Sequence, residues 1–168
     1  MKILIAYYTR TGVTKKVAEN MASKLGADVE EIVDLEDRSG ALGYLAAGRD
    51  ATLKKLTRIK PIEQKPSKYD IIILGTPVWA WTTTPAIRSY ITQNRPFLFN
   101  KKFAFFCTMG GNGDVGTFEA MEELLGVEPI ETLALLTTDV MKKTPKYDTA
   151  IEEFVAAIKK IPKHYPKE

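Results

Sequence analysis

Short apolar runs alternate with helical patterns along the whole chain. The clearest run covers residues 69–75, in which three isoleucines and a leucine follow one another. Unbroken apolar runs of this length are typical of parallel strands that are buried on both faces of a sheet. The expected strands cover residues 2–8, 28–35, 69–75, 102–108 and 130–136. The alternation predicts an α/β fold, in which helical crossovers build an open parallel sheet with helices on both faces.

The connecting helices are marked by signals at their ends. Gly26 and Gly126 follow helical patterns as C-caps. Thr84-Pro85 and Thr144-Pro145 each join an N-cap threonine to a proline at the first helical position. Together with apolar residues at helical spacing, these signals predict helices over residues 14–25, 84–93, 115–126 and 144–161.

Residues 36–68 are less regular than the rest. Four leucines lie at helical spacing within them: Leu42, Leu45, Leu53 and Leu56. Two glycines in this stretch lower its helix propensity, and Pro61 and Pro66 favour an extended connector after it. We expect a helical insertion that packs on the sheet. No repeat, low-complexity tract or linker marks a boundary, so residues 1–168 are expected to form a single domain.

The loop after the first strand consists of Thr9, Arg10, Thr11, Gly12, Val13 and Thr14. It precedes a helix, so free backbone N–H groups and the positive end of the helix dipole face a ligand there. Three threonine hydroxyls can donate to an anion, and the glycine allows close approach. The turn contains neither G-x-x-x-x-G-K-[ST] nor G-x-G-x-x-G. We interpret it as a phosphate site with Arg10, then Lys15 and Lys16, as nearby cations. The alternatives are that the turn is a plain threonine-rich helix cap and that Arg10 points to solvent.

The loop after the third strand holds two tryptophans in the run Thr76, Pro77, Val78, Trp79, Ala80 and Trp81. Loops normally expose polar residues, so two indoles need an apolar partner. One candidate is a planar ring system, which a Trp face covers by offset stacking, while backbone groups of residues 78–81 reach its polar edge. The alternative is that one or both indoles pack on a neighbouring helix or a protein partner.

The loop after the fourth strand is rich in glycine and contains Thr108, Met109, Gly110, Gly111, Asn112, Gly113 and Asp114. Its glycines let the main chain approach a flat ligand edge-on, and Asn112 and Asp114 can make polar contacts or cap the next helix. The alternative is a flexible turn between a strand and a helix. All three loops follow strands, and ligands of open parallel sheets bind outside the carboxyl ends of the strands. The sequence therefore predicts one shared site.

Two of these motifs carry a resemblance to a known family. Thr9-x-Thr11-Gly12-x-Thr14 and Gly75-Thr-Pro-Val-Trp79 resemble loops of the flavodoxin superfamily, and the likeness extends over essentially the whole chain. The resemblance implies a flavodoxin-like three-layer sandwich with a five-stranded parallel sheet in the order 2-1-3-4-5. It also implies FMN, with its phosphate at residues 9–14, its isoalloxazine ring along residues 76–81, and residues 108–114 at the other edge of the ring.

The chain also departs from that family. Electron-transfer flavodoxins are typically acidic, whereas 24 Lys and Arg against 21 Asp and Glu give this chain a net charge of +3. The third loop lacks the stacking aromatic that is often found there, and the insertion is longer than the compact form needs. We therefore expect a carrier that passes electrons between redox partner proteins, or else an FMN-dependent reductase of NAD(P)H and quinones. The third alternative is a binding or scaffold domain that has lost its cofactor.

The composition excludes several other classes. The basic residues are spread among acids, which argues against nucleic-acid binding, and no apolar run approaches the ~20 residues of a membrane span. The single cysteine, Cys107, is expected in the core, and the single histidine, His164, gives no basis for a zinc site. We find no side-chain set for hydrolysis and name no catalytic residue. Since no cleavable signal peptide is evident, the expected location is the cytoplasm. A homodimer is one possible oligomeric state.

Overall fold

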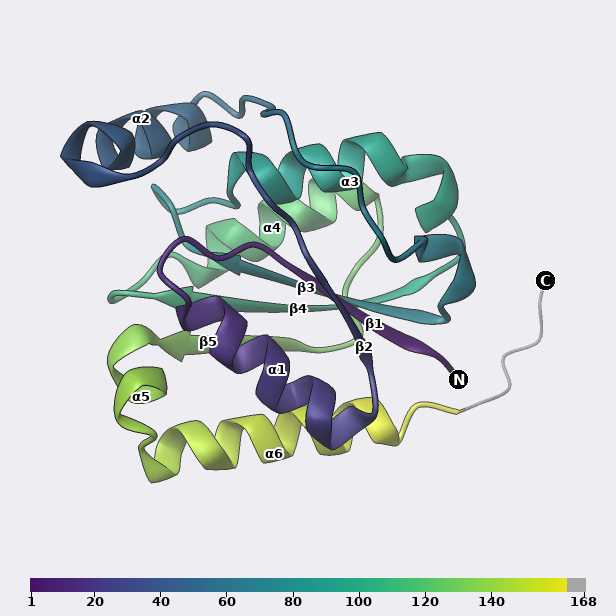
Figure 1. Ribbon diagram of the computed structural model, residues 1–168. Coiled ribbons are helices and arrows are strands. Elements are labelled where there is room, and N and C mark those ends of the chain that lie inside the picture. Colours follow the sequence, from purple (N-terminus) through teal and green to yellow (C-terminus); the bar gives the residue numbers. More distant parts are fainter. Residues whose placement is uncertain (163–168) are drawn as a thin grey trace.

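The computed structural model describes residues 1–162 of the chain, and His164 lies outside the described residues. Figure 1 shows a central sheet between two layers of helices. The strands are β1 (Ile3–Tyr7), β2 (Asp28–Glu31), β3 (Ile71–Pro77), β4 (Lys102–Met109) and β5 (Thr132–Leu136). The α-helices are α1 (Val13–Leu25), α2 (Gly40–Thr52), α3 (Pro85–Leu98), α4 (Asp114–Leu125), α5 (Thr137–Lys142) and α6 (Pro145–Lys159), and a short 3-10 helix η1 covers Pro66–Lys68.

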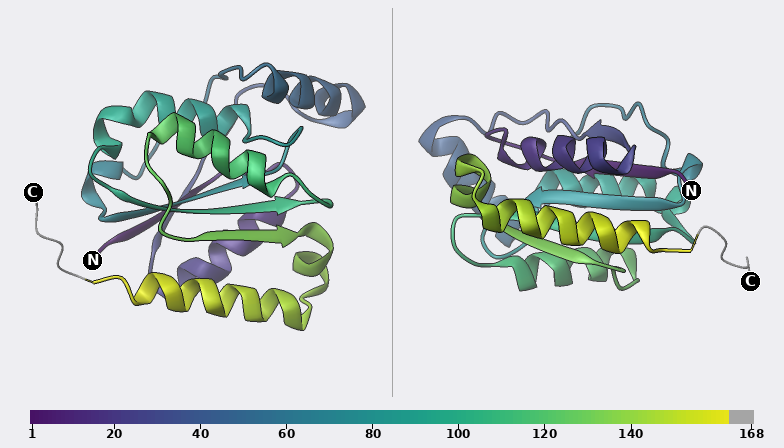
Figure 2. Two further views of the ribbon diagram at one scale, coloured as in Figure 1. Left: turned by 180° about the vertical axis from the view of Figure 1, so that it is seen from behind. Right: turned by 90° about the horizontal axis from the view of Figure 1, so that it is seen from below.

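The predicted sheet is confirmed. All strand pairs are parallel, and the strands lie in the order β2-β1-β3-β4-β5. Helices α1, α5 and α6 cover one face, while α3 and α4 cover the other (Figures 1 and 2). This α/β architecture is flavodoxin-like, and it places the loops after β1, β3 and β4 at one edge of the sheet.

Each central strand divides its apolar side chains between the two faces. In β1, Ile3 and Ile5 join the core under α1 and α6, whereas Leu4 and Ala6 join the core under α3. Strand β3 divides its side chains in the same way. Successive side chains of a strand point to opposite faces of the sheet. An unbroken apolar run therefore fits a strand that has helices packed on both faces. Full burial of one such Ile or Leu contributes about 1.5–3 kcal/mol.

The predicted strand over residues 28–35 is too long at its carboxyl end. Strand β2 ends at Glu31 because residues 33–35 pair with the connector instead: the N–H of Leu35 donates to the carbonyl of Arg58, and that of Lys60 to the carbonyl of Val33, each at 2.9 Å. The buried carboxylate of Glu30 also accepts the N–H groups of residues 63 and 64. The connector thereby covers the sheet edge, which would otherwise expose unpaired backbone groups.

The insertion joins the core on the α3 side of the sheet only through small residues, and not through the predicted leucine stripe. Helix α2 lies beside α3 and stands out from the body of the molecule (Figure 1). Its buried face consists of small residues, Gly43, Ala47 and Ala51, and a Cβ on Gly43 would meet the backbone of Arg38 at 2.5 Å. The four leucines of the predicted stripe are exposed. Small side chains allow close approach of the backbones, and this attachment turns the leucines outward.

A buried ion-pair network fixes the base of α2. The guanidinium of Arg38 donates to carboxylate oxygens of Asp34 at 3.2 Å and of Asp50 at 2.6 Å. The hydroxyl of Thr57 donates to Asp34 at 2.6 Å, and the backbone of Thr57 exchanges hydrogen bonds with Ser89 of α3. Arginine suits such a site because its planar guanidinium can bind two carboxylates at once.

The helices differ from the prediction chiefly in three places. Helix α3 continues through Pro96 to Leu98, because a proline in the last turn removes only one hydrogen bond. Helix α6 ends at Lys159, and the six-residue helix α5 has no counterpart in the prediction.

A search of residues 1–162 for a helix that could span a membrane finds none with the necessary length and apolar character.

Candidate functional site at the carboxyl edge of the sheet

The loop after β1 leaves the amino end of α1 without a side-chain cap. Gly12 is the N-cap residue with φ 85°, a left-handed conformation that suits glycine. The hydroxyl of Thr9 accepts a hydrogen bond from the Gly12 N–H at 3.0 Å and so stabilises the turn. The first turn of α1 contains no acidic residue. An uncapped helix start with no acid in its first turn is well suited to bind an anion.

Two side chains from elements that flank these loops are in contact: Thr14 lies in the first turn of α1 and Thr108 near the end of β4. The hydroxyl oxygens of Thr14 and Thr108 lie 2.8 Å apart, and both residues are buried. The carbonyl of Thr108 accepts the N–H of Val78 at 2.9 Å. These contacts bring together the loops after β1, β3 and β4, which were expected to share one edge of the sheet.

The two tryptophans have different surroundings. Trp79 is buried and packs edge-on against Tyr8, with ring centroids 5.5 Å apart and planes at 89°. The sequence left open whether an indole packs on the protein itself, and Trp79 does so. Trp81 is 67% exposed, and its Nε1–H donates to the side-chain oxygen of Asn112 at 3.1 Å. Of the two indoles, Trp81 is therefore the one that a ligand can reach.

The turn that carries Trp81 is strained. Trp79 and Thr82 exchange backbone hydrogen bonds at 3.1 and 3.2 Å, which closes a two-residue turn. Its central residues, Ala80 and Trp81, both have positive φ, at 48° and 59°. Such a turn normally takes Gly, Asn or Asp. Among residues 1–162, the N–H groups of Ala80 and Trp81 make no hydrogen bond, so two donors stand at the tip of this loop.

The glycine-rich loop packs closely against the Trp loop. Gly113 is the N-cap of α4 with φ 108°, and a Cβ there would lie 2.7 Å from Val78 and 3.1 Å from Trp81. A Cβ on Gly116 would meet the Trp81 carbonyl oxygen at 2.5 Å. Neither Asn112 nor Asp114 caps α4. Glycines here allow two loops to touch, while Gly110 and Gly111 have open space around them.

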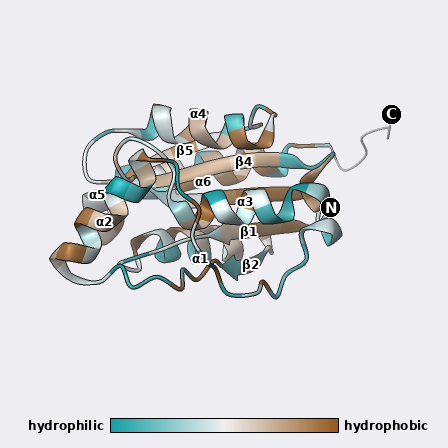
Figure 3. Ribbon diagram, turned by 90° about the horizontal axis from the view of Figure 1, so that it is seen from above, coloured by the Kyte–Doolittle hydropathy of each residue, from teal (hydrophilic) through white to brown (hydrophobic). Residues whose placement is uncertain are grey.

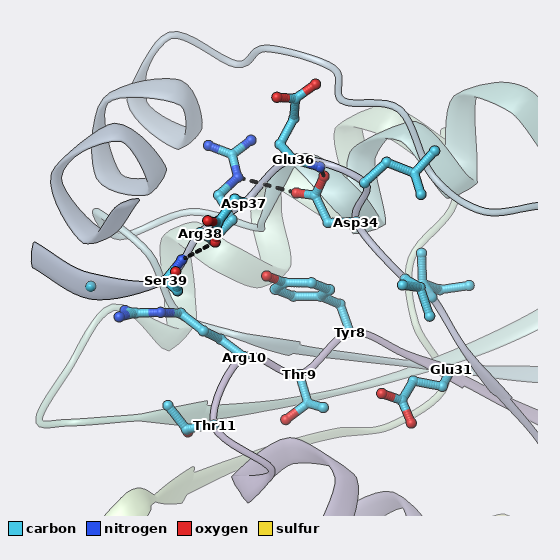
Figure 4. Close-up of a pocket in the computed structure, with 14 residues that line it drawn as sticks. Tyr8, Thr9, Arg10, Thr11, Glu31, Asp34, Glu36, Asp37, Arg38 and Ser39 are labelled. Atoms are coloured by element: carbon cyan, nitrogen blue, oxygen red, sulfur yellow. Dashed lines mark hydrogen bonds and ion pairs between the residues drawn. The ribbon is translucent and has the colours of Figure 1, made fainter. Parts of the chain in front are cut away.

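A cavity of about 600 Å³ opens on the β2 side of the first loop (Figure 4). It is lined by residues 8–11 and 31–40 and includes no residue of the Trp loop or the glycine-rich loop. Arg10 extends along this cavity toward Ser39, and its guanidinium carbon lies 5.1 Å from the ring centre of Tyr44 in α2. Lys15 is paired with Glu31 at 2.8 Å.

Three contributors to this edge were missing from the sequence prediction: Tyr8, residues 34–39 and Tyr44. Burial, followed by the nearby Asp34 carboxylate, raises the pKa of Tyr8 to about 12, so its hydroxyl stays neutral. The acidic stretch after β2 was the only sequence signal for the cavity wall. Nothing in the sequence connects Tyr44 with Arg10, because that contact depends on how α2 is attached.

Cys107 lies in the core, as expected. It is fully buried in β4, and burial raises the pKa of its thiol to about 12. A thiol that stays protonated is a poor nucleophile. Within the part of the chain that the structure describes, no group of three or more His, Cys, Asp or Glu side chains is arranged to hold a metal ion.

The fold and the site define an α/β protein that presents an uncapped helix start, an exposed indole and a glycine-rich loop at one sheet edge. The family model for flavodoxin matches residues 2–129, and the chain belongs to the flavodoxin family. Comparison with functionally curated proteins gives no match.

Solved structures share the fold over most of their length. A flavoprotein of Lactobacillus acidophilus, solved in complex with FMN, is 25% identical with a TM-score of 0.69, covering 84% of this chain and 97% of its own. The two-electron reduced flavodoxin of Megasphaera elsdenii is 21% identical with a TM-score of 0.54, over 92% and 96% of the two chains. An NADH:FMN oxidoreductase is 17% identical with a TM-score of 0.58, over 94% and 90%.

Proposed function

We propose that this chain binds FMN at the three loops and carries electrons between redox partner proteins. The proposal is based on one observation: an uncapped helix start, an exposed indole and a glycine-rich loop lie together at one edge of the sheet. Membership of the flavodoxin family and the likeness to a flavoprotein in complex with FMN support the choice of cofactor.

In this proposal residues 9–14 hold the phosphate. The backbone N–H groups at the start of α1 donate to it, and the exposed hydroxyl of Thr11 adds a further donor. Arg10 and Lys16 supply positive charge nearby, whereas Lys15 is engaged by Glu31. Hydrogen bonds to a charged acceptor contribute about 1.5–3 kcal/mol each, so the phosphate anchors the cofactor.

Residues 76–81 and residues 108–114 would hold the isoalloxazine ring. Trp81 offers an apolar face, and the N–H groups of Ala80 and Trp81 are the donors available to the polar edge of the ring. Gly110 and Gly111 let backbone approach from the other side. Bound FMN supplies the chemistry, because it exchanges one or two electrons. The protein sets the balance between redox states through these donors and the charges around them.

A second candidate is an FMN-dependent oxidoreductase of NAD(P)H and quinones. The net charge of +3 favours it, because carriers of this family are typically acidic. In that role a substrate would bind beside the exposed Trp81. We place either activity in the cytoplasm, and the buried free thiol of Cys107 is compatible with a reducing compartment.

Two measurements on purified protein test the proposal. Titration of FMN with the chain should quench the fluorescence of the flavin and saturate at one FMN per chain. The loaded protein is then mixed with NAD(P)H and a quinone. Absence of steady NAD(P)H oxidation, together with reduction by a separate reductase, supports the carrier, whereas steady oxidation supports the oxidoreductase. Failure to bind FMN would contradict both and leave a domain without cofactor.

A further inference from the structure

The cavity on the β2 side of the first loop contains a buried hydroxyl without a partner. Tyr8 is 5% exposed, and within residues 1–162 its hydroxyl makes no hydrogen bond. Its ring packs edge-on against Trp79, and the hydroxyl points into the cavity, toward residues 37–39 (Figure 4). Buried polar groups normally have a hydrogen-bond partner. The hydroxyl of Tyr8 is therefore available to a ligand in this cavity.

The amino end of α2 lines the same cavity through Ser39 and Gly40. Figure 3 shows α2 at the end of the molecule opposite the amino terminus, the end toward which β1 runs. Ser39 is the N-cap residue, but its side chain makes no capping hydrogen bond, and the first turn of α2 contains no acidic residue. The first N–H groups of a helix have no partner within the helix and lie at the positive end of its dipole. A second uncapped helix start, besides that of α1, therefore borders this cavity.

Arg10 adds a positive charge at the same place. Its guanidinium forms no ion pair within the described part of the chain, and it extends past the ring of Tyr44 toward Ser39 (Figure 4). Both Arg10 and Arg38 oppose the rise in the pKa of Tyr8, which places their charges close to its hydroxyl. A hydroxyl, a guanidinium and a helix start thus converge from three segments of the chain, and all three can donate to an anion.

Most carboxylates around the cavity are already neutralised. Three of the four acidic residues that line it form ion pairs: Glu31 with Lys15, Asp34 with Arg38, and Glu36 with Arg58. The fourth, Asp37, accepts the N–H of Ser39 at 2.9 Å and is exposed, so that water and salt screen its charge. Asp37 is therefore the carboxylate that opposes an anion here, and its removal provides a test of the sign of the ligand charge.

We infer that this cavity is a second anion site, which binds the phosphate group of a small organic phosphate at the start of α2. A phosphate group offers three acceptor oxygens, one each for the N–H groups of α2, the guanidinium of Arg10 and the hydroxyl of Tyr8. Helix starts and arginine are both well suited to phosphate. The volume of about 600 Å³ lies within the range of small-molecule sites, so the cavity has room for more than a bare ion.

The second anion site is distinct from the site proposed for FMN. The phosphate of FMN is assigned to the start of α1, whereas this cavity includes no residue of the Trp loop or the glycine-rich loop. Of the donors named for the second site, only Arg10 belongs to the loop that is proposed to hold FMN. The inference does not rest on the proposed function, because Tyr8 and the start of α2 do not depend on bound FMN.

Isothermal titration calorimetry of the full chain, with and without saturating FMN, tests the inference. ADP and ribose 5-phosphate are the probes, and adenosine is the control without phosphate. At least one of the two phosphates should bind under both conditions, and adenosine should not bind. If neither phosphate binds, or if FMN abolishes their binding, the second site does not exist. A chain that fails to bind FMN would contradict the proposed function, and the titration without FMN would still test this site.

Single substitutions test the donors. Tyr8→Phe should raise the dissociation constant of the bound phosphate about tenfold or more, because a hydrogen bond to a charged group is lost. Tyr90→Phe is the matched control, since Tyr90 is fully buried, its hydroxyl also has no partner among the described residues, and it does not line the cavity. Asp37→Asn should lower the dissociation constant about threefold, because an opposing charge is removed. Unchanged binding by Tyr8→Phe, or weaker binding by Asp37→Asn, would overturn the inference.

Amide NMR spectra of the FMN-loaded chain locate the phosphate directly. Addition of the phosphate that binds should shift the N–H signals of Gly40 and Ala41, since these groups lie in the first turn of α2. Shifts that are confined to residues 12–16 would assign the phosphate to the start of α1 and exclude the second site.

Discussion

The hydroxyl oxygens of Thr14 and Thr108 lie 2.8 Å apart, although 94 residues separate them in the chain. Either hydroxyl can be the donor, and each has only one hydrogen to donate. If Thr14 donates to Thr108, it has no hydrogen left for a phosphate. Thr14 can serve an anion only when Thr108 donates to it, so the proposed phosphate site depends on a residue of the third loop.

We predict that replacing Thr11 by Ala and Thr14 by Val together weakens FMN binding by about 3–6 kcal/mol, because two charge-assisted hydrogen bonds are lost. Valine preserves the shape of the buried threonine. The measurement is fluorescence titration of FMN, with thermal unfolding to show that the variant is folded. Thr149→Ala, at an exposed position of α6, serves as the control. Unchanged affinity in the double variant would mean that the phosphate binds elsewhere.

The sheet could be predicted from the sequence because its central strands, β1, β3 and β4, are buried on both faces. Residues 71–75 are all buried and have no polar side to expose. Gly26 and the two Thr-Pro pairs end or begin helices by local chemistry. The orientation of α2 could not be predicted in this way. Its leucines have helical spacing, but whether they face inward depends on the close fit of Gly43 against Arg38, which is a tertiary contact.

Gly12 and Gly113 should respond differently to substitution by alanine. Both have positive φ, but nothing lies within 4 Å of a Cβ at Gly12, while a Cβ at Gly113 would press on Val78. We expect Gly12→Ala to lower the free energy of unfolding by about 1–2 kcal/mol from backbone strain alone. Gly113→Ala should lower the free energy of unfolding by more than this, because the Trp loop must also move. Urea unfolding of both variants checks the order, and equal losses would contradict the contact.

The proposed site was less predictable than the fold. The loops that form the site could be predicted, since each follows a strand. The environment of each indole could not be predicted. Trp79 is buried because Tyr8, at the end of β1, provides an edge-on partner. Left-handed Ala80 and Trp81 carry no sequence signal, since neither is a residue that favours this conformation.

The ion pairs of Arg38 should contribute strongly to stability. Its side chain is 7% exposed, and Asp34 and Asp50 are 3% and 15% exposed. Arg38→Ala removes the buried guanidinium that both carboxylates share, and loss of one partner of a buried ion pair typically costs about 3–5 kcal/mol. Arg58→Ala, which removes a pair that is exposed on both sides, should cost less than about 1 kcal/mol. Chemical unfolding at neutral pH compares the two.

The contribution of Asp50 should depend on pH. Its hydrogen bond with Arg38 lowers the pKa of the carboxyl from 3.8 to about 2. The folded state thus favours the charged form, so the stabilisation is fully present above the ordinary pKa and is lost as the pH falls through about 2. Asp50→Asn should be less stable than the unmodified chain at neutral pH, and the difference should shrink over this acid range. A difference that is constant with pH would exclude the charge as its cause.

Arg88 offers a test of a buried charge. The residue is 4% exposed in α3, and its Nε and Nη2 have no hydrogen-bond partner among the described residues. Burial lowers the pKa of the guanidinium, although Glu123 opposes the shift. Replacing buried charges by apolar side chains of similar size is often stabilising by about 1–4 kcal/mol. We expect Arg88→Met to be at least as stable as the unmodified chain, and a clear loss of thermal stability would show that Arg88 has a partner in solution.

The strained turn after β3 leads to the last prediction. Ala80 has φ 48°, and a left-handed conformation costs an L-residue about 1–2 kcal/mol. Glycine removes that cost but loses about 0.5–1 kcal/mol through the entropy of the unfolded chain. Ala80→Gly should therefore raise the free energy of unfolding slightly, by about 0.5–1 kcal/mol. The N–H at position 80 is retained, so FMN affinity should not fall. Lower stability of the variant in urea unfolding would contradict a left-handed Ala80, and a loss of FMN affinity at unchanged stability would show that the strain itself positions the Trp loop for the cofactor.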